Sequence, residues 1–185
     1  MAARRIRGER QWHAQRGITM IEACMVLAVS GVLIGAAVPG LQGVIDARRI
    51  GSAASQLATD LQLVRTEAVL RNEPVRLSFY ARADATCWVV HTGSAAQCTC
   101  NAPGPAVCGG GAAAIKTVQW PSRDHVRVQA NVASMLFDPL HGTSTPTGTV
   151  RVIGAQGREV QHIVNVMGRV RSCSPLGAMP GYRPC

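Results

Sequence analysis

The sequence predicts an α+β protein in which one long N-terminal helix packs on antiparallel β-sheet. Three features of its 185 residues support this fold class. An uncharged, mostly apolar run covers residues 23–45, and apolar residues then recur with helical spacing to about residue 71. About seven short β-rich runs follow, separated by Gly, Pro, Asn and Asp. A helix with one apolar face can bury that face on the sheet that follows it.

The apolar run is long enough to cross a membrane. Its 23 uncharged residues would reach about 34 Å as a helix, against about 30 Å for a hydrocarbon core. Residues 1–17, ahead of the run, contain one acid, Glu9, and five arginines, which favours a cytoplasmic N-terminus and export of the remainder: Arg4, Arg5, Arg7, Arg10 and Arg16. A cleaved secretory signal is the ordinary alternative. It fits less well, because the run exceeds the usual core of about 7–15 residues and no A-x-A-like site ends it.

The second part of the helix is amphipathic. Its apolar positions follow the spacing of one helix face: Ile50, Ala53, Ala54, Leu57, Leu61, Val64 and Ala68. Asn72 and Pro74 are expected to end the helix. Because no strong turn signal separates this part from the apolar run, we predict one helix from residue 18 to about residue 71.

The predicted strands begin at Val75, in the alternating run "VRLSF". The further runs are "CWVV", "IKTVQW", "HVRVQA", "SMLFD", "TGTVRVIG" and "REVQHIVNV". Residues 95–114 are rich in Gly, Ala, Pro and Cys, and we expect them to form a long loop pinned by disulfides.

The cysteines agree with export. Cys24 lies in the apolar run, and an even number follows it, which suggests disulfides: Cys87, Cys98, Cys100, Cys108, Cys173 and Cys185. A zinc site is the alternative, although the spacings do not repeat the paired C-x-x-C pattern of structural zinc. Six cysteines allow about 15 pairings. Cys173 with Cys185 is the favoured pair, because both lie in a Pro/Gly-rich tail that could not order itself otherwise; such a closure is worth roughly 3 kcal/mol.

The exported part is basic. From residue 46 onward it has 14 Lys and Arg against 8 Asp and Glu, and 13 of the 14 are arginine. Arginine holds phosphate with two donors. A GC-rich genome would also favour arginine codons, so this enrichment alone does not identify a partner.

We expect no enzyme, metal or cofactor. The five histidines are scattered along the sequence: His13, His91, His125, His141 and His162. No P-loop, H-E-x-x-H or G-x-S-x-G motif is present in the sequence. The few acids are spread along a basic domain, which also argues against a paired-carboxylate hydrolase.

Four stretches carry a resemblance to a known family. "RGITMIEA" resembles the class III signal of type IV pilins and type II secretion pseudopilins, with Ile18 where that signal usually has phenylalanine. "QLVRTEAVLRNEPVRLSF" is similar to the segment that ends the helix in GspH/FimT minor pilins. "FDPLHGTSTPTGTV" and "GRVRSC…GYRPC" resemble the FimT side of that family.

The resemblance implies a pilin-like fold with three parts. Residues 1–17 would be a leader, residues 18–45 a transmembrane and filament-core helix, and residues 46–185 a periplasmic globular domain with a basic tail at 168–185. A prepilin peptidase would cut between Gly17 and Ile18, and the new amine of Ile18 would be N-methylated. The subunit would wait in the inner membrane and then join other major and minor pilins in an extracellular filament.

Glu22 is an acid at the edge of the apolar run. A charge inside a bilayer costs about 2.5–3.5 kcal/mol, so it persists where it finds a partner. We expect Glu22 to pair with the amine of Ile18 during assembly, in its own or a neighbouring subunit. The alternative is that Glu22 is only an N-terminal helix acid favoured by the helix dipole.

The stretch "GRVR" carries the functional hypothesis. If it is extended, Arg169 and Arg171 point to one side and Val170 to the core. The stretch, Gly168 included, resembles the DNA-binding motif of FimT pilins from naturally transformable bacteria. A disulfide between Cys173 and Cys185 would hold Arg183 nearby. The alternatives are a solvated strand face or a subunit contact.

The sequence therefore predicts a type IV minor pilin that binds DNA non-specifically for uptake in natural transformation. One alternative is a GspH-type minor pseudopilin of a type II secretion system, without DNA binding. Another is a pilus-assembly or adhesion factor that acts through the loop from Cys87 to Cys108.

Overall fold

The computed structural model describes residues 17–101 and 104–185, without the side chains of residues 37–39. The chain divides into two compact units between Leu41 and Gln42, and each is described by itself. Helix α1 (Met20–Arg71) contributes to both units, as the sequence predicts. Of the predicted leader, residues 1–16 lie outside the described residues.

The first part of α1 exposes its apolar side chains. The Thr19 hydroxyl accepts a hydrogen bond from the Glu22 N–H at 3.3 Å, which satisfies one of the free donors of the first turn. By length and composition, no single helix of the described residues qualifies as a membrane span; Met20–Ala36 and Gly40–Arg71 qualify together, as a broken one. Large exposed apolar residues of this part include Ile21, Met25, Leu27, Val32 and Leu33.

The second part of α1 forms the predicted core stripe. Its seven apolar positions, from Ile50 to Ala68, are all fully buried. They pack with Trp88, Met135 and Phe137, which come from strands, in one cluster. Burial of each large side chain contributes about 1.5–3 kcal/mol, so this stripe, more than helix propensity, holds the helix to the sheets.

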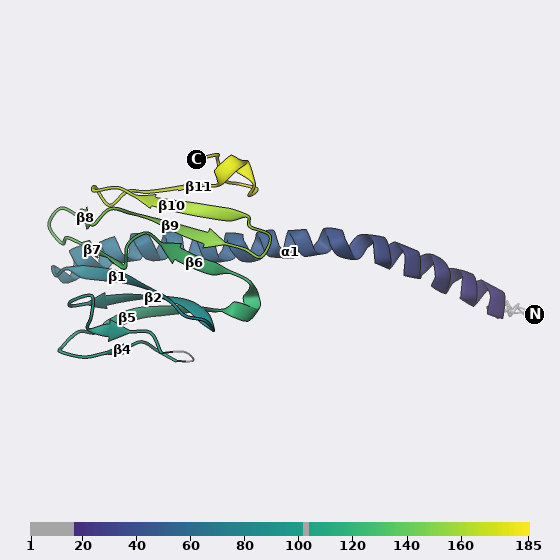
Figure 1. Ribbon diagram of the computed structural model, residues 1–185, viewed down its shortest axis with the longest axis horizontal. Helices are drawn as coiled ribbons and strands as arrows, with labels where there is room; N and C mark the ends of the chain where they lie inside the picture. Colours follow the sequence, from purple (N-terminus) through teal and green to yellow (C-terminus); the bar gives the residue numbers. More distant parts are fainter. Residues whose placement is uncertain (1–16, 102–103) are drawn as a thin grey trace, which may run out of the picture. The chain divides into compact units, whose positions relative to one another are not determined.

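Two antiparallel sheets cover this part of the helix (Figure 1). The first has the order β5-β2-β1-β7-β8. Its strands are β1 (Val75–Ala81), β2 (Ala85–Thr92), β5 (Ala114–Pro121), β7 (Ser134–Phe137) and β8 (Ser144–Thr145). The second has the order β11-β10-β9-β6. Its strands are β6 (Arg127–Ala130), β9 (Gly148–Ile153), β10 (Glu159–Val164) and β11 (Val170–Cys173).

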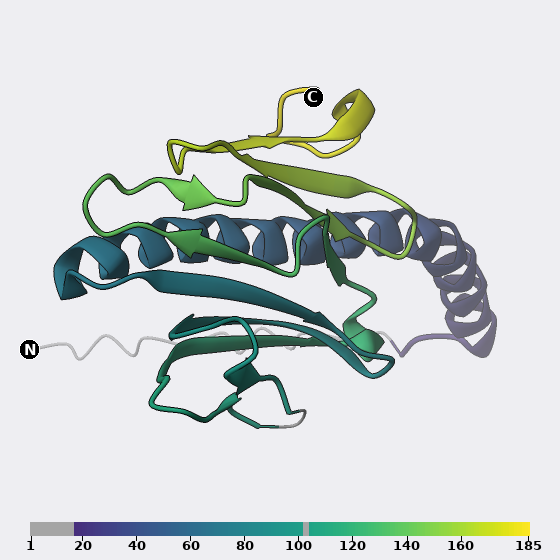
Figure 2. The same ribbon diagram turned by 60° about the vertical axis from the view of Figure 1, so that its left-hand side comes forward.

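The sheets are joined by short connections, and the C-terminal segment continues from the edge strand β11 (Figure 2). The 3-10 turn η1 (Ser122–Asp124) links β5 to β6, and η2 (Pro175–Gly177) follows β11. The seven runs expected from the sequence match β1, β2, β5, β6, β7, β9 and β10. The described residues add β11 and three strands of two residues, which are too short to produce a periodicity in the sequence.

Two acids on α1 anchor it to the sheets. The Asp60 carboxylate is fully buried; it accepts hydrogen bonds from Lys116 Nζ at 2.5 Å and from Trp88 Nε1 at 2.7 Å. One turn after Gln42, the Asp46 carboxylate lies 3.1 Å from the Arg158 guanidinium. Asp60 therefore joins the helix to the first sheet, and Asp46 joins it to the turn between β9 and β10.

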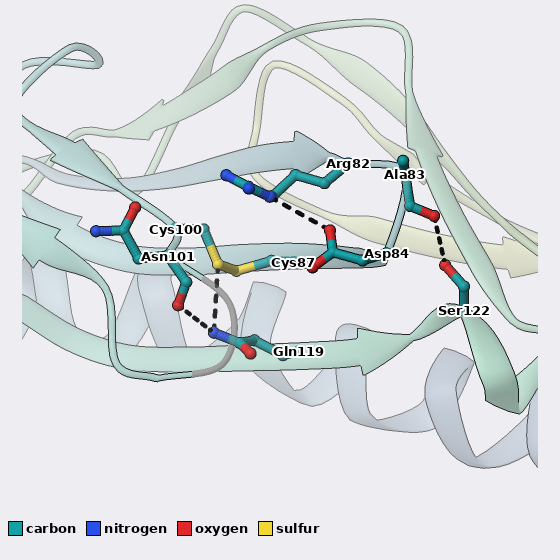
Figure 3. A network of polar contacts seen from close by, with 8 residues as sticks. All are labelled: Arg82, Ala83, Asp84, Cys87, Cys100, Asn101, Gln119 and Ser122. Carbon is teal, nitrogen blue, oxygen red and sulfur yellow. Dashed lines mark hydrogen bonds and ion pairs between the residues drawn. A yellow bond between two sulfur atoms is a disulfide. The ribbon is translucent and has the colours of Figure 1, made fainter.

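The loop after β2 is held by two disulfides, Cys87–Cys100 and Cys98–Cys108. The second links β3 (Cys98–Thr99) to β4 (Val107–Cys108). Figure 3 shows the Gln119 side chain beside the first disulfide, where its amide donates to the Cys100 sulfur at 3.6 Å and to the Asn101 carbonyl at 3.3 Å. Because all four sulfurs are in disulfides, these cysteines offer no thiolates for the zinc alternative.

Candidate nucleic-acid interface

The β10–β11 hairpin positions the "GRVR" stretch. Val164 pairs with Val170, and Ile163 pairs with Arg171. The loop between the strands is closed by Asn165. Its N–H donates to the Arg169 carbonyl at 3.1 Å, and its side-chain oxygen accepts from the Arg169 N–H at 2.9 Å. The backbone of Arg169 is therefore fixed on both sides by one residue.

Gly168 is required by the loop geometry. Its φ is +67°, a left-handed value that L side chains rarely adopt. A Cβ at this position would lie 2.3 Å from the Gly142 carbonyl oxygen, which belongs to the turn between β7 and β8. The glycine of "GRVR" thus serves packing, and it brings the hairpin against a neighbouring turn.

The two arginines of the hairpin are exposed. Val170, between them, is partly buried and packs against the core cluster. Neither Arg169 nor Arg171 forms an ion pair with any residue that the structure describes. Both guanidinium groups are therefore open to a ligand from outside the chain.

The C-terminal segment brings a third arginine to the end of β11. Cys173 and Cys185 are joined by a disulfide, and the Ser174 N–H donates to the Arg183 carbonyl at 2.9 Å. Met179 is buried beneath this segment, at 2% exposure. The Arg183 side chain is exposed.

The acids closest in sequence to this region are engaged elsewhere. Glu159 on β10 is 2.6 Å from the Arg151 guanidinium. Burial raises the pKa of the Glu159 carboxyl, but hydrogen bonds from Arg151 and Gln161 outweigh it and hold this pKa below its usual value. In the turn before β8, the backbone N–H of His141 lowers the pKa of the Asp138 carboxyl. No acid among the described residues forms an ion pair with Arg169, Arg171 or Arg183.

A buried histidine lies under the hairpin. His162 on β10 is fully buried, and its Nδ1 lies 2.8 Å from the Ser172 hydroxyl of β11. Burial lowers the pKa of the His162 imidazole to about 4, so the ring is neutral at pH 7. Its Nε2 has no hydrogen-bond partner among the described residues.

The chemistry of this surface suits phosphate. Guanidinium groups stay charged at all physiological pH values and offer planar pairs of N–H donors. Arg171 lies in β11 and Arg169 in the loop directly before it; two residues of extended chain span roughly 7 Å, a spacing on the scale of neighbouring phosphates. Such contacts bind the backbone of a nucleic acid without reading its sequence.

The other predicted site residues lie at the start of the described chain. Gly17 is exposed, Ile18 is 76% exposed, and Glu22 lies in the exposed first turn of α1. Within the described residues the Glu22 carboxylate has no partner. Cleavage, methylation and assembly at these residues stay predictions.

Sequence reasoning missed three residues that shape the candidate interface. Asn165 fixes the Arg169 backbone, and Gly142 receives the close approach of Gly168. Arg65, on α1, places its Nε 2.6 Å from where a Cβ on Gly142 would lie. The N-x-x-G spacing from Asn165 to Gly168 is a turn signal that could have identified the loop. Nothing in the sequence indicates the Arg65 contact, because its partner is 77 residues away.

The fold and this surface define an α+β subunit with one long N-terminal helix and a basic edge hairpin. The family described as "Type II transport protein GspH" matches residues 53–168. Because the match covers more than half of the chain, the protein belongs to the GspH family of minor pilins and pseudopilins.

Two crystal structures of the type IV minor pilin FimU from Pseudomonas aeruginosa (strain PAO1) are similar to this chain, both at 18% identity. In one crystal form the TM-score is 0.46, with 68% of this chain and 96% of that chain covered. In the other it is 0.49, with 69% and 93% covered. No curated protein matches the chain at a significant level. The family assignment rests on the sequence match.

Proposed function

We propose that this protein is a minor pilin of a type IV pilus and that it binds DNA non-specifically for uptake in natural transformation. The observation that carries the DNA-binding part is the group of exposed, unpaired arginines on one hairpin and the tail stapled to it: Arg169, Arg171 and Arg183. No enzymatic activity is proposed.

The proposed route begins with a precursor. Residues 1–17 form the leader, residues 18–45 the anchor, and residues 46–185 the periplasmic domain of a single-pass inner-membrane protein. A prepilin peptidase cuts between Gly17 and Ile18, and Ile18 is N-methylated. The exposed apolar part of α1 supports this route, because its side chains need a cover that the described chain does not supply. Mass spectrometry of the mature protein tests it, since a mature protein that still begins before Ile18 contradicts it.

In the filament, the anchor helix would pack with those of other major and minor pilins. Glu22 would pair with the amine of Ile18, which exists only after cleavage. The carboxylate is exposed and without a partner in the described chain, as this pairing requires.

The DNA-binding test uses the full chain in a neutral detergent and fluorescence anisotropy with duplex DNA. The variant is Arg169→Gln with Arg171→Gln. The matched control is Arg49→Gln with Arg127→Gln, which removes the same charge from exposed positions elsewhere. Loss of two phosphate contacts should weaken binding of all sequences equally and lower the slope of log affinity against log salt by about 2.

Two outcomes contradict the proposal. One is wild-type protein that does not bind duplex DNA at low salt. The other is an equal loss of binding in both double variants, which would show general charge attraction without a site. In cells, the Arg169 and Arg171 double variant should keep its pili and lose transformation.

The family description favours a second candidate, a GspH-type minor pseudopilin of a type II secretion system. This candidate is structural and does not bind DNA. A gene deletion separates the two: loss of exoprotein secretion with normal transformation favours the pseudopilin, and the reverse favours the proposed function.

A further inference from the structure

Two adjoining pockets lie at the start of the second compact unit. One has a volume of about 400 Å³ and includes Gln42, Ile45 and Arg49 of α1 in its lining. The other has a volume of about 290 Å³ and is lined in part by Arg127. His125 and Ala155 line both, so the two pockets adjoin, and together they are called here the α1 cleft.

The walls of the α1 cleft are held in place by the fold. On one side, His125 has a left-handed φ of +55° and donates its N–H to the Ser122 carbonyl at 3.0 Å. On the other side, the turn between β9 and β10 is tied to α1, since Asp46 accepts a hydrogen bond from the Ala155 N–H at 3.3 Å. The cleft is therefore framed by ordered turns and one helix.

The cleft is basic. Asp46 lines it, but its charge is offset by Arg158 at 3.1 Å. Asp124, in η1, is the further acid next to it in sequence. Two arginines, Arg49 and Arg127, line the cleft, and both are exposed and without an ion pair among the described residues. Because Arg158 offsets Asp46, they leave a charge of about +2 in the lining.

The position of the cleft along α1 indicates what ligand it meets. Ile45 ends the uncharged run, and Arg49 follows one helical turn later, about 6 Å along the axis. Outside a hydrocarbon core of about 30 Å, each polar headgroup layer is roughly 5–8 Å thick. With Ile45 at the edge of the hydrocarbon core, Arg49 reaches the depth of the headgroups.

We propose that the α1 cleft binds the phosphate of an anionic phospholipid headgroup while the subunit is in the membrane. Arg49 and Arg127 hold the phosphate oxygens, and the His125 ring donates a further hydrogen bond. The proposal rests on the membrane-anchored state given under Proposed function, and it is independent of DNA binding. Ile45 in the lining suits an acyl chain beside the headgroup, a feature that nucleic acid would not use.

The test is native mass spectrometry of the full chain in neutral detergent with equal amounts of phosphatidylglycerol and phosphatidylcholine. Arg49→Gln with Arg127→Gln is compared with Arg169→Gln with Arg171→Gln, which removes equal charge from the hairpin. Wild type should retain phosphatidylglycerol preferentially. The cleft variant should lose apparent affinity for it by about 30-fold, and the hairpin variant should keep it. Both variants should unfold at the wild-type temperature, since all four side chains are exposed.

Each other outcome overturns the proposal. If wild type shows no preference for phosphatidylglycerol, the α1 cleft is not a lipid site. If both variants lose affinity equally, lipid binding reflects general charge attraction. Displacement of the lipid by tens of millimolar inorganic phosphate would make it a site for free phosphate. Flotation of the full chain with phosphatidylcholine vesicles checks anchoring separately, so a chain that does not float contradicts the proposed function before the cleft is tested.

Discussion

Both parts of α1 carry large apolar side chains, but they bury them differently. Before Leu41, large side chains such as Leu27 and Val32 are 72% and 73% exposed; after it, Leu57 and Leu61 are 0% exposed. The second part has its partner surface within the chain, on the two sheets. The first part has no such partner among the described residues. The apolar composition of a helix therefore indicates that it packs against another surface. The fold shows that only the second part of α1 finds that surface within the described chain.

The acids of the helix follow the same division. Asp60 in the second part is buried and holds two donors from the sheet, Lys116 and Trp88. Glu22 in the first part is exposed and its carboxylate has no described partner. One acid serves folding of the domain, and the other is free to serve assembly.

The largest expected difference is between equivalent leucine truncations in the two parts. Leu61→Ala should lower the free energy of unfolding by about 2–5 kcal/mol, because it leaves a cavity in the core. Leu33→Ala, at a side chain 65% exposed, should change it by less than about 0.5 kcal/mol. Urea denaturation in neutral detergent measures both. Equal losses would show that the domain core also depends on the first part of α1.

Removal of the buried acid is the next largest effect. Asp60→Ala should cost about 3 kcal/mol, because it leaves the Trp88 N–H without an acceptor and separates Lys116 from its counter-ion. Asp60→Asn should cost less, because the amide oxygen can still accept from Trp88. A cost below about 0.5 kcal/mol for Asp60→Ala in urea denaturation would contradict the anchoring role.

The free energy of unfolding of the domain should also depend on pH, through the buried His162. The pKa of His162 is about 4 in the folded chain and about 6.5 when unfolded, so the unfolded chain binds the proton more readily between these values. Stability should therefore fall as pH falls through this window, by roughly 2 kcal/mol between pH 7.5 and pH 5.

Urea denaturation across pH 7.5 to 5 checks this expectation, with His162→Asn as the comparison because an amide does not titrate. The variant should lose most of the slope. Burial also lowers the pKa of His91, so a smaller slope of the same sign should remain. An unchanged slope in the variant would assign the effect to other groups.

The smallest effect on stability is expected at the other acid. Glu22→Ala should leave the free energy of unfolding within about 0.5 kcal/mol of wild type, because the carboxylate is exposed. In cells it should leave peptidase processing intact and impair incorporation into filaments. Immunoblots of sheared pili against whole cells measure this, and normal incorporation would rule out the pairing with Ile18.

The sequence predicted the helix well because its signals are local. The stripe from Ile50 to Ala68 has a period of 3.6 residues, and Pro74 ends it, so both bounds were close to those observed. Seven strands were also predicted. β11 was considered extended only conditionally, because its four residues contain two polar side chains and pair on one edge alone.

The parts of the fold and candidate site that the sequence did not predict depend on contacts between distant residues. Cys98 pairs with Cys108 because β3 and β4 meet there, and Cys87 on β2 pairs with Cys100, which follows β3. The pairing of Cys173 with Cys185 was predicted, because both lie in a short Pro/Gly-rich tail that could not order itself otherwise. The contact of Gly168 with Gly142 arises only when the hairpin of one sheet reaches a turn of the other.

The Cys173–Cys185 disulfide also sets when the basic surface is complete. Arg183 is held beside Ser174 in the loop that this bond closes, and such bonds persist in oxidising compartments but not in the cytosol. On the proposed route, the Cys173–Cys185 bond would therefore be absent while the newly made chain is in the cytosol, where the cell's own chromosome lies. The full set of arginines would come together only after export, on the side of the membrane where incoming DNA arrives.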